Sequence, residues 1–576
     1  MGGFLYINKH LCQDAEKKLE ASRTGFRQAG FGAPVTISGA SYALDFYGKI
    51  GSGIVNLIDT GDGTFLASIG TLILGDTVGQ DALRKLQEAR RAGRLALELS
   101  RCLGQFALLA GERGEVTIHR DVHSSYEIFQ TSDLGIVGSS FLAVATALPR
   151  RSVDPASVLE YVFNGVTLGT GTPIQEVRKV DLGETLHLSH APFATRTRPD
   201  VSPPVFDGPV EAMAEQVFHA LSEHTRRLIR IFGGNMTLAL SGGYDTRLLL
   251  ALFRHAGTIP KLFVYGNAGS EDVRIASDIA RAEGLPLEVL DKHLPLQTSP
   301  EEFAGMVRRN FHIYDGYSQI WLFRHESERE ARAARHAGGA LNVHGGAGEV
   351  LRNFFGLPDR PIATDHVIAA FFSQFDRRMC RNPADVRLYE ASVAGKVADI
   401  FGREQRVLSR QQVEAIYPHL RCRSWFGRDN SINGRVGYSS LPFYESRIVD
   451  LSLRTPIRHK NYGDFQSRLI RRADPALAKH PSQYGHNFEA DAPFRKRAAS
   501  WVGYQRPALL RRNMYRLRRL RKAGAPGATP FGVQVLGLTG GTEIMSRHFD
   551  MSAVTDTEHF VRICTLEYLY QSLSAS

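Results

Sequence analysis

Apolar and polar residues follow different patterns in the two halves of this chain. Up to residue 195, short apolar runs broken by Gly and Asp predict β-strands at 54–58, 66–69, 106–110, 116–119, 125–130 and 135–138. Two stretches with helical spacing, 80–101 and 155–163, interrupt these runs. The first half is therefore expected to consist mainly of short strands.

The second half alternates helix and strand patterns. A proline-rich stretch over 198–209 is typical of an extended linker. Apolar periodicity then predicts helices at 209–231, 246–256 and 270–284 and strands at 236–240, 260–265 and 286–290. Such alternation indicates a parallel sheet of nucleotide-binding type, followed by a mainly helical region beyond 300. We predict domains at 1–195 and 210–576, joined by a linker at 196–209.

The stretch Ser241-Gly-Gly-Tyr-Asp-Thr246 joins the first predicted strand and helix of the second half. The strand ends at Leu240, and Gly242 and Gly243 allow a sharp turn without a Cβ clash. Backbone N–H groups at the helix start, with the hydroxyls of Ser241 and Thr246, favour a bound anion. Asp245 can hold a Mg²⁺ that accompanies a polyphosphate. The alternative is a glycine turn without a ligand.

Length and composition narrow the class of protein. A chain of 576 residues needs two or more domains, and 43% hydrophobic with 22% charged residues is typical of a soluble globular protein. No apolar run approaches the roughly 20 residues of a membrane span. The N-terminus lacks the features of a signal peptide. Five scattered cysteines without a CxxC pair favour a reducing cytoplasm.

The net charge of +11 comes from one segment. Residues 495–522 contain eleven Lys or Arg and no Asp or Glu, which equals the whole excess. Leucines at helical spacing within it predict a helix that packs on the protein. A substrate-docking surface and an incidental affinity for nucleic acid are the alternatives.

Several motifs together resemble the asparagine-synthetase family. The 241–246 loop resembles the Ser-Gly-Gly-x-Asp-Ser/Thr loop of ATP pyrophosphatases, and the first half resembles a class II glutaminase domain at 104–110, 116–121, 137–140, 154–161 and 176–186. The resemblance implies an N-terminal Ntn-hydrolase-like αββα sandwich, which mixes helices and sheets as α+β folds do. It also implies a C-terminal α/β domain with a parallel sheet, of the adenine-nucleotide α-hydrolase-like type.

The resemblance also breaks at the N-terminus. Glutaminases of this family begin Met-Cys-Gly, and the freed cysteine attacks glutamine. Here the chain begins Met1-Gly2-Gly3, so we expect the first domain to be inactive. The same cysteine is missing in β-lactam synthetases and lasso-peptide cyclases, which join an internal amine to an adenylated carboxylate.

Other motif positions of the family are matched in part. By resemblance, Val264 and Gly266 line the adenine and ribose pocket. The family motif Ser-Gly-Glu-Gly-Ala-Asp-Glu aligns on Val343-His-Gly-Gly-Ala-Gly-Glu349, which places Gly345 and Gly346 near the phosphates and Glu349 as a helper of Asp245. Gly348, however, replaces the motif's aspartate.

A catalytic lysine is expected in a late loop of the family. This chain has Gln483-Tyr-Gly-His-Asn-Phe488 there, without a lysine. His486 is our candidate for the positive charge at the developing adduct, with Arg495 or Lys496 as alternatives, whereas a lone loop histidine is more often a surface residue. Glu445 stands where the family has another acidic residue.

These observations predict a cytoplasmic ligase that uses ATP and Mg²⁺. A carboxylate attacks the α-phosphate, pyrophosphate leaves, and an amine of the substrate closes a macrolactam or β-lactam with release of AMP. Asparagine synthesis with ammonia or glutamine and a catalytically degenerate scaffold are the alternatives. The expected partner is a small-molecule or peptide substrate with a carboxylate and an amine. A homodimer stays open, a membrane is not expected, and nucleic acid is disfavoured.

Overall fold

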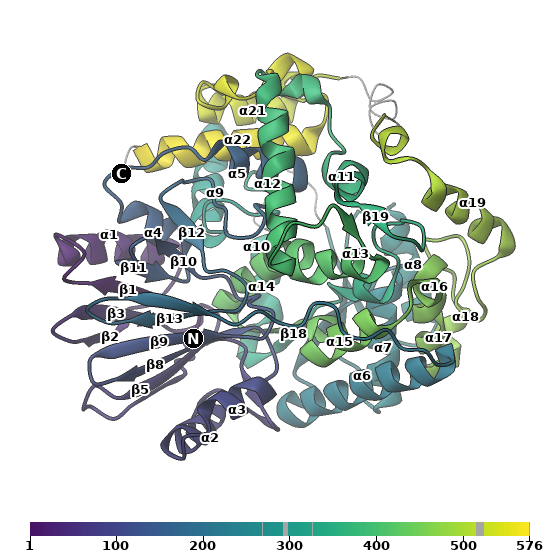
Figure 1. Cartoon of the computed structure of the whole chain (residues 1–576), viewed down its shortest axis with the longest axis horizontal. Helices are drawn as coiled ribbons and strands as arrows, with labels where there is room; N and C mark the ends of the chain where they lie inside the picture. Colours follow the sequence, from purple (N-terminus) through teal and green to yellow (C-terminus); the bar gives the residue numbers. More distant parts are fainter. Residues whose placement is uncertain (268, 292–297, 325–326, 514–523, 575–576) are drawn as a thin grey trace.

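The computed structural model describes residues 1–267, 269–291, 298–324, 327–513 and 524–574 (Figure 1). Two six-stranded antiparallel sheets form the first half of the chain. One has the order β12-β10-β11-β1-β3-β2, with bounds β1 Gly3–Asn8, β2 Val35–Ser38, β3 Tyr42–Tyr47, β10 Phe129–Thr131, β11 Ile136–Gly138 and β12 Val177–Lys179. The other has the order β14-β13-β9-β8-β5-β4, with bounds β4 Leu57–Asp59, β5 Phe65–Gly70, β8 Phe106–Glu112, β9 Glu115–Arg120, β13 Glu184–Leu188 and β14 Phe193–Arg196.

These two sheets pack face to face between two layers of helices. Alternate residues of β1 point to opposite sides, because successive side chains of a strand do so. Phe4 and Tyr6 join the apolar core between the sheets, and Leu5 and Ile7 pack under the helices of the outer face. Those helices are α1 (Ala15–Gln28) and α4 (Phe141–Thr146), while α2 (Gln80–Arg91) and α3 (Leu95–Arg101) cover the other sheet (Figure 1). The order helix, sheet, sheet, helix agrees with the sandwich that was expected.

A five-stranded parallel sheet forms the centre of the second half. Its order is β17-β16-β15-β18-β21, with bounds β15 Met236–Ala239, β16 Lys261–Tyr265, β17 Leu287–Leu290, β18 Leu341–Val343 and β21 Tyr438–Ser440. All neighbouring strands run parallel. The three predicted strands and the predicted parallel sheet are confirmed. The sequence did not predict β18 and β21, because each is only three residues long and wholly buried, without a period-2 pattern.

Helices make up most of the rest of the second half. They include α6 Val210–Phe232, α7 Tyr244–His255, α8 Glu271–Ala282, α9 Pro300–Ile313, α12 Pro383–Phe401, α14 Arg423–Val436, α15 Ser446–Arg454, α17 Asp464–Ala473, α19 Phe494–Gln505, α21 Pro530–Thr539 and α22 Thr557–Ser574. In the described part of the chain, none of them combines the length and apolar character that crossing a bilayer requires. The predicted linker starts in the last residue of β14 and has no helix or strand before Val210.

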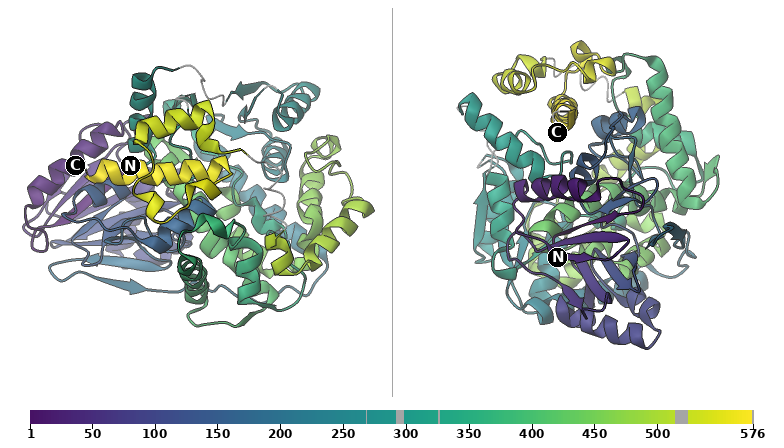
Figure 2. Two further views of the ribbon diagram at one scale, coloured as in Figure 1. Left: turned by 90° about the horizontal axis from the view of Figure 1, so that it is seen from above. Right: turned by 90° about the vertical axis from the view of Figure 1, so that its left-hand side faces the viewer.

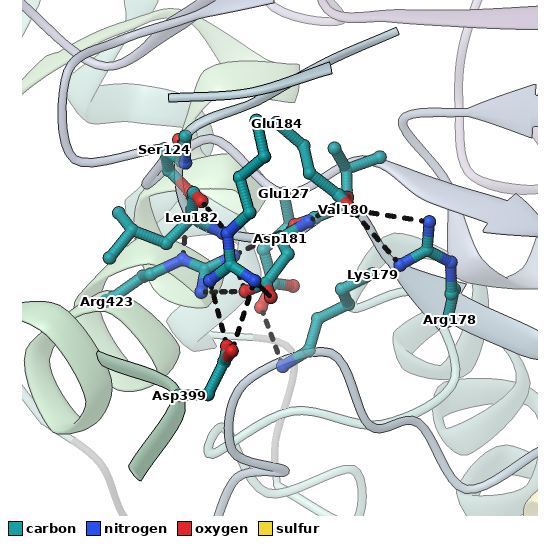
Figure 3. Close-up of polar contacts among 12 residues, drawn as sticks. Ser124, Glu127, Arg178, Lys179, Val180, Asp181, Leu182, Glu184, Asp399 and Arg423 are labelled. Atoms are coloured by element: carbon teal, nitrogen blue, oxygen red, sulfur yellow. Dashed lines mark hydrogen bonds and ion pairs between the residues drawn. The ribbon is translucent and has the colours of Figure 1, made fainter. Parts of the chain in front are cut away.

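The two halves are joined by several contacts rather than by the linker alone. The C-terminal helix α22, drawn in yellow, lies against α5 (Pro155–Asn164) of the first half, where Arg562 donates to the Val162 carbonyl at 3.0 Å (Figure 2). Arg423 of α14 reaches Asp181 of the first half at 3.2 Å, and Arg196 bridges Asp181 and Asp399 (Figure 3). Of these contacts the Arg423–Asp181 pair is buried, whereas the Arg196–Asp399 pair is partly exposed.

Candidate functional site

The 241–246 loop lies where β15 ends and α7 begins. The N–H of Leu240 donates to the Phe263 carbonyl at 2.8 Å and continues the sheet to the edge of the loop. The hydroxyls of Ser241 and Thr246 lie 2.9 Å apart, and the N–H of Gly243 donates to Ser241 Oγ at 3.2 Å. The twelve-residue helix α7 directs its N-terminus, which favours an anion, into this turn.

The loop after β18 packs against the 241–246 loop. Since β15 and β18 are neighbouring parallel strands, their carboxyl ends lie side by side. A Cβ at Gly345 would lie 2.8 Å from Thr246 Cγ2, and one at Gly346 would lie 2.4 Å from the Phe426 ring. A side chain at Gly345 would therefore push against the 241–246 loop, and one at Gly346 would push against Phe426 of α14. In α/β proteins this edge of the sheet is the usual place for a ligand.

Polar side chains hold the Asp245 carboxylate in place. Arg352 Nη2 lies 2.8 Å from Asp245 Oδ2 and 3.4 Å from Glu349 Oε1. Gln466 Nε2 donates to Asp245 Oδ1 at 2.7 Å, and the Tyr417 hydroxyl donates to Glu349 Oε2 at 2.8 Å. Burial raises the pKa of Asp245 to about 6, although Arg352 opposes this rise. The site thus combines two carboxylates and one guanidinium.

Gly348 leaves room for this arrangement. A Cβ at Gly348 would lie 2.2 Å from Asp245 Oδ1, and the Gly348 carbonyl accepts from Gln466 Nε2 at 3.1 Å. An aspartate at this position, as in the family motif, would require Asp245 to move. The departure at Gly348 and the position of Asp245 are therefore coupled.

The donor set around Asp245 does not fit a preformed Mg²⁺ site. Mg²⁺ takes oxygen ligands in near-octahedral geometry. Asp245 and Glu349 meet here, but the cationic Arg352 lies between them. Within the described residues, no group of three or more His, Cys, Asp or Glu side chains could hold a metal. Asp245 as a metal ligand stays a prediction, and we derive no step through the ion.

Aromatic side chains form the other side of the loop. The Tyr244 ring stacks on Tyr484 and Phe488, with centroids 4.5 Å and 4.4 Å apart. His486 Nε2 lies 3.5 Å from the Tyr244 hydroxyl, which donates to the Tyr462 carbonyl at 3.3 Å. Burial lowers the pKa of His486 below its ordinary 6.5. Its catalytic role stays a prediction, and the observed role is to contact Tyr244.

Two cationic side chains contact Tyr484 in the 483–488 loop, where the resemblance led us to expect a lysine. Lys496 Nζ donates to the Tyr484 carbonyl and lies 4.9 Å from the Tyr484 ring centroid. Arg352 Nη1 donates to the Tyr484 hydroxyl at 3.1 Å. The positive charge therefore lies around Tyr484 rather than on His486.

The two residues predicted to line an adenine pocket, Val264 and Gly266, present no exposed side chain. Val264 of β16 is buried in the core. Gly266 has φ of 148°, and a Cβ there would lie 2.6 Å from Ser270 Oγ. Its N–H donates to the Leu290 carbonyl at 3.1 Å, so this N–H is already bonded. The contacts of these two residues with a nucleotide stay predictions.

Neighbouring atoms leave no space for a side chain at Gly2, the position where the resemblance led us to expect a cysteine. A Cβ at Gly2 would lie 2.7 Å from the Arg435 carbonyl oxygen and 2.9 Å from the Phe31 ring. The amine of Met1 is buried and donates to the Ser68 carbonyl at 2.7 Å. Position 2 therefore lacks both a nucleophile and the room for one.

The basic segment 495–522 is described only in part. Residues 495–505 belong to α19, while Arg516, Arg518 and Arg519 lie outside the described residues. Leu509 and Leu510 are 65% and 48% exposed, so these two leucines do not pack the segment onto the protein as expected.

Sequence reasoning missed Arg352, Gln466, Tyr417 and Tyr484. Arg352 lies three residues after the last position of the 343–349 motif, outside the stretch that the resemblance covers. Gln466 lies on α17, 221 residues from Asp245, and only the fold brings the two together. The only available signal was that the carboxylate of Asp245, placed in a tight turn, would need a cationic partner.

Neither a protein-family model nor a curated protein sequence matches this chain. Two solved structures are similar to it, each with 12% sequence identity and a TM-score of 0.24. One is glutamine phosphoribosylpyrophosphate (PRPP) amidotransferase from B. subtilis complexed with ADP and GMP, with coverage of 52% of this chain and 68% of that chain. The other is an allosteric regulatory enzyme of purine biosynthesis, with 59% and 73%. Similarity at this level carries no conclusion about the activity of this chain.

Proposed function

We propose that this chain is an ATP-dependent, AMP-forming ligase that makes an amide bond within its substrate. The supporting observation is that two glycine loops meet at the carboxyl ends of β15 and β18. They bring Asp245, Thr246 and Glu349 to one place beside the N-terminus of α7. Such a place suits a pyrophosphate group.

In this proposal the chain binds and orients, and ATP supplies the phosphoanhydride that is cleaved. The hydroxyls of Ser241 and Thr246 and the first-turn N–H groups of α7 bind phosphate oxygens. Arg352 turns from Asp245 towards the phosphates and offsets their charge. The substrate carboxylate attacks the α-phosphate, pyrophosphate leaves, and an amine then displaces AMP from the acyl-adenylate.

The amine is proposed to belong to the substrate itself. Glutamine hydrolysis would need a nucleophile at position 2, where a Cβ would meet the Arg435 carbonyl at 2.7 Å. Closure of a lactam needs no external ammonia, which is compatible with a first domain that only packs against the second. The substrate is a small molecule or peptide that carries both groups.

A degenerate scaffold is the second candidate, and one observation favours it. The 241–246 loop is braced by its own contacts: the Gly242 N–H donates to Asp272 Oδ1 at 3.1 Å, and the Ser241 N–H donates to Thr246 Oγ1 at 3.1 Å. Asp245 is likewise paired with Arg352 at 2.8 Å. A ligand would have to replace some of these bonds, at about 1 kcal/mol for each that is lost.

The Asp245→Asn variant tests the proposal. It keeps the shape of the side chain but removes the charge that pairs with Arg352. The sequence predicts that Asp245 holds the Mg²⁺ that accompanies ATP, so we expect weaker binding of Mg·ATP and loss of AMP and pyrophosphate formation, with unfolding by urea little changed. Binding is measured with a fluorescent ATP analogue, and pyrophosphate release with a panel of amino acids and peptides. Asp278→Asn, an exposed change on α8, is the control.

Each result selects one candidate. AMP formation at the parental rate in Asp245→Asn would contradict the role of Asp245. ATP binding by the parent without pyrophosphate release in any mixture would favour the scaffold. Glutamate release from glutamine would revive asparagine synthesis.

A further inference from the structure

Helix α19 presents an apolar face to solvent. The side chains of Phe494, Trp501 and Val502 are 84%, 55% and 52% exposed. At 100° per residue these three lie on one side of the helix, flanked by Arg495 and, just past the helix end, by Arg506. We call Phe494, Arg495, Trp501, Val502 and Arg506 the α19 surface. Arg497 turns inward, 3.7 Å from Asp464 and over the Tyr462 ring. A surface helix normally turns its apolar side to the core, whereas no residue of α19 is buried and these apolar side chains face solvent.

The opposite face of α19 faces the candidate site. Lys496 donates to the Tyr484 carbonyl, and the Tyr504 ring stacks on Tyr462 with centroids 5.8 Å apart. Tyr484 and Tyr462 both contact Tyr244, the first residue of α7. The α19 surface is therefore joined to the 241–246 loop through a single layer of side chains.

Contacts also fix the end of α19. Arg511 donates to the Phe355 carbonyl at 3.2 Å and to the Gly503 carbonyl at 2.8 Å. Figure 1 places α19 at the outer edge of the molecule, and its residues contact the turn at Asn461–Gly463. The exposed apolar face is thus carried by a helix that is anchored at both ends and open on its outer side.

The charge of this region defines the partner that it suits. Residues 495–513 contain six Lys or Arg and no Asp or Glu. Exposed apolar side chains between arginines match a partner in which apolar and acidic groups alternate. Arg495 and Arg506 can pair with carboxylates, while Phe494 and Trp501 provide contact area in the centre, the usual place of strong binding residues.

We propose that the α19 surface binds an acidic, apolar segment of a peptide substrate whose reacting end lies at the 241–246 loop. This inference rests on the proposed ligase function, which requires a substrate with a carboxylate and an amine. The shared layer of Tyr484 and Tyr462 favours a peptide over a lipid bilayer or nucleic acid, because only a ligand that must also reach the loop gains from this proximity.

A binding assay without ATP tests this surface separately from the chemistry. The probe is a pool of fluorescein-labelled decapeptides randomised over Asp, Glu, Leu and Phe. A second pool carries Lys and Arg in place of the acidic residues. We expect saturable anisotropy changes with the acidic pool only, at about 0.15 M salt.

Two variants divide the contributions. Phe494→Ser/Trp501→Ser removes the apolar centre, and Arg495→Gln/Arg506→Gln removes two flanking charges. Each is expected to weaken binding about tenfold or more, and the second also reduces the dependence on salt. The control is Leu97→Ser/Arg101→Gln, which changes an exposed leucine and arginine on α3 of the first half.

Several results would overturn the proposal. Absence of binding, equal binding of both pools, or an equal loss in the α3 control would each do so. Tighter binding to vesicles of phosphatidylcholine with about one quarter phosphatidylserine would identify a membrane surface instead. Tighter binding to single-stranded DNA would identify nucleic acid.

Failure of the ligase proposal is distinguishable from failure of this one. Asp245→Asn lies outside the α19 surface and should bind the acidic pool as the parent does. A chain that binds these peptides but never releases pyrophosphate retains the α19 surface and loses the ligase assignment. A chain that releases pyrophosphate but does not bind the peptides retains the ligase assignment and loses the proposed role of the α19 surface.

Discussion

Asp245 and Glu349 lie on either side of the Arg352 guanidinium. Arg352 Nη2 is within 2.8 Å of one carboxylate and 3.4 Å of the other, and its side chain is 18% exposed. A cation shared by two carboxylates offsets their mutual repulsion, which water would otherwise screen only weakly in so enclosed a place. Arg352 thus offsets part of the negative charge that Asp245 and Glu349 bring to this place.

Removal of Arg352 should therefore be costly. In Arg352→Met, Asp245 and Glu349 face each other without a cation, and we expect the free energy of unfolding to fall by about 2–4 kcal/mol. Arg352→Lys should lose less, because it keeps the charge but not the forked geometry. Urea unfolding measures both, with the exposed Arg360→Met as the control.

A double variant tests whether repulsion is the cause. Adding Asp245→Asn to Arg352→Met removes one of the facing charges and should recover part of the lost stability. If the double variant is as unstable as the sum of the two single changes, then lost packing of Arg352, and not charge, explains the effect.

Among the elements, the β15–loop–α7 unit was the most predictable from sequence. Its strand, its glycine turn and its helix each carry a local signal that agrees with the others, and the observed β15 and α7 match the predicted strand 236–240 and helix 246–256 to within two residues. In contrast, β1, β2, β3 and α1 were not predicted, although β1 is central to its sheet. Every residue of β1 is buried, so its sequence lacks the alternation of polar and apolar residues that marks a half-exposed strand.

The residues of the candidate site likewise include some that the sequence could name and some that only the fold brings together. Asp245, Gly345 and Glu349 belong to contiguous motifs and could be named from the sequence. Gln466 and Tyr417 reach these residues from separate helical segments, and no local pattern reports such a meeting. Arg352 is intermediate, since it is near Glu349 in sequence but its partner Asp245 is 107 residues away.

The entry of β1 into its sheet provides a prediction for the first half of the chain. Gly2 precedes β1, and a Cβ there would lie 2.7 Å from the Arg435 carbonyl oxygen. We expect Gly2→Ala and Gly2→Cys to lower the free energy of unfolding by about 1–3 kcal/mol through overpacking. Gly2→Cys should gain no glutaminase activity.

Urea unfolding and glutamate release from glutamine measure the two effects. Gly32→Ala is the matched control, because a Cβ there would meet nothing within 4 Å. A Gly2→Cys variant as stable as the parent and able to release glutamate would show that the position is still a functional glutaminase site.

At the scale of the whole molecule, buried polar groups of each half bind the backbone of the other. Lys49 Nζ donates to the Gly434 and Gly437 carbonyls, each at 2.8 Å. In the opposite direction, the Gly104 N–H donates to both carboxyl oxygens of Glu445, at 3.1 and 3.2 Å. Such groups cost energy to bury and are satisfied only when the halves are docked, so folding of the two halves is coupled.

Glu445 makes this coupling depend on pH. Burial raises its pKa to about 8 from an ordinary 4.5. The carboxyl group therefore stays protonated in the folded chain at pH values where it is already ionised in the unfolded chain. Its contribution to stability is complete below about pH 4.5 and is lost as pH rises towards 8. Glu445→Gln, which cannot ionise, should be free of this loss.

Between pH 5 and 8 the parent should therefore lose about 2–4 kcal/mol relative to Glu445→Gln in urea unfolding. Glu88→Gln, an exposed change on α2, should run parallel to the parent over this range. A parent and Glu445→Gln that keep a constant difference in stability would mean that Glu445 is ionised in the folded chain and that another group couples the two halves.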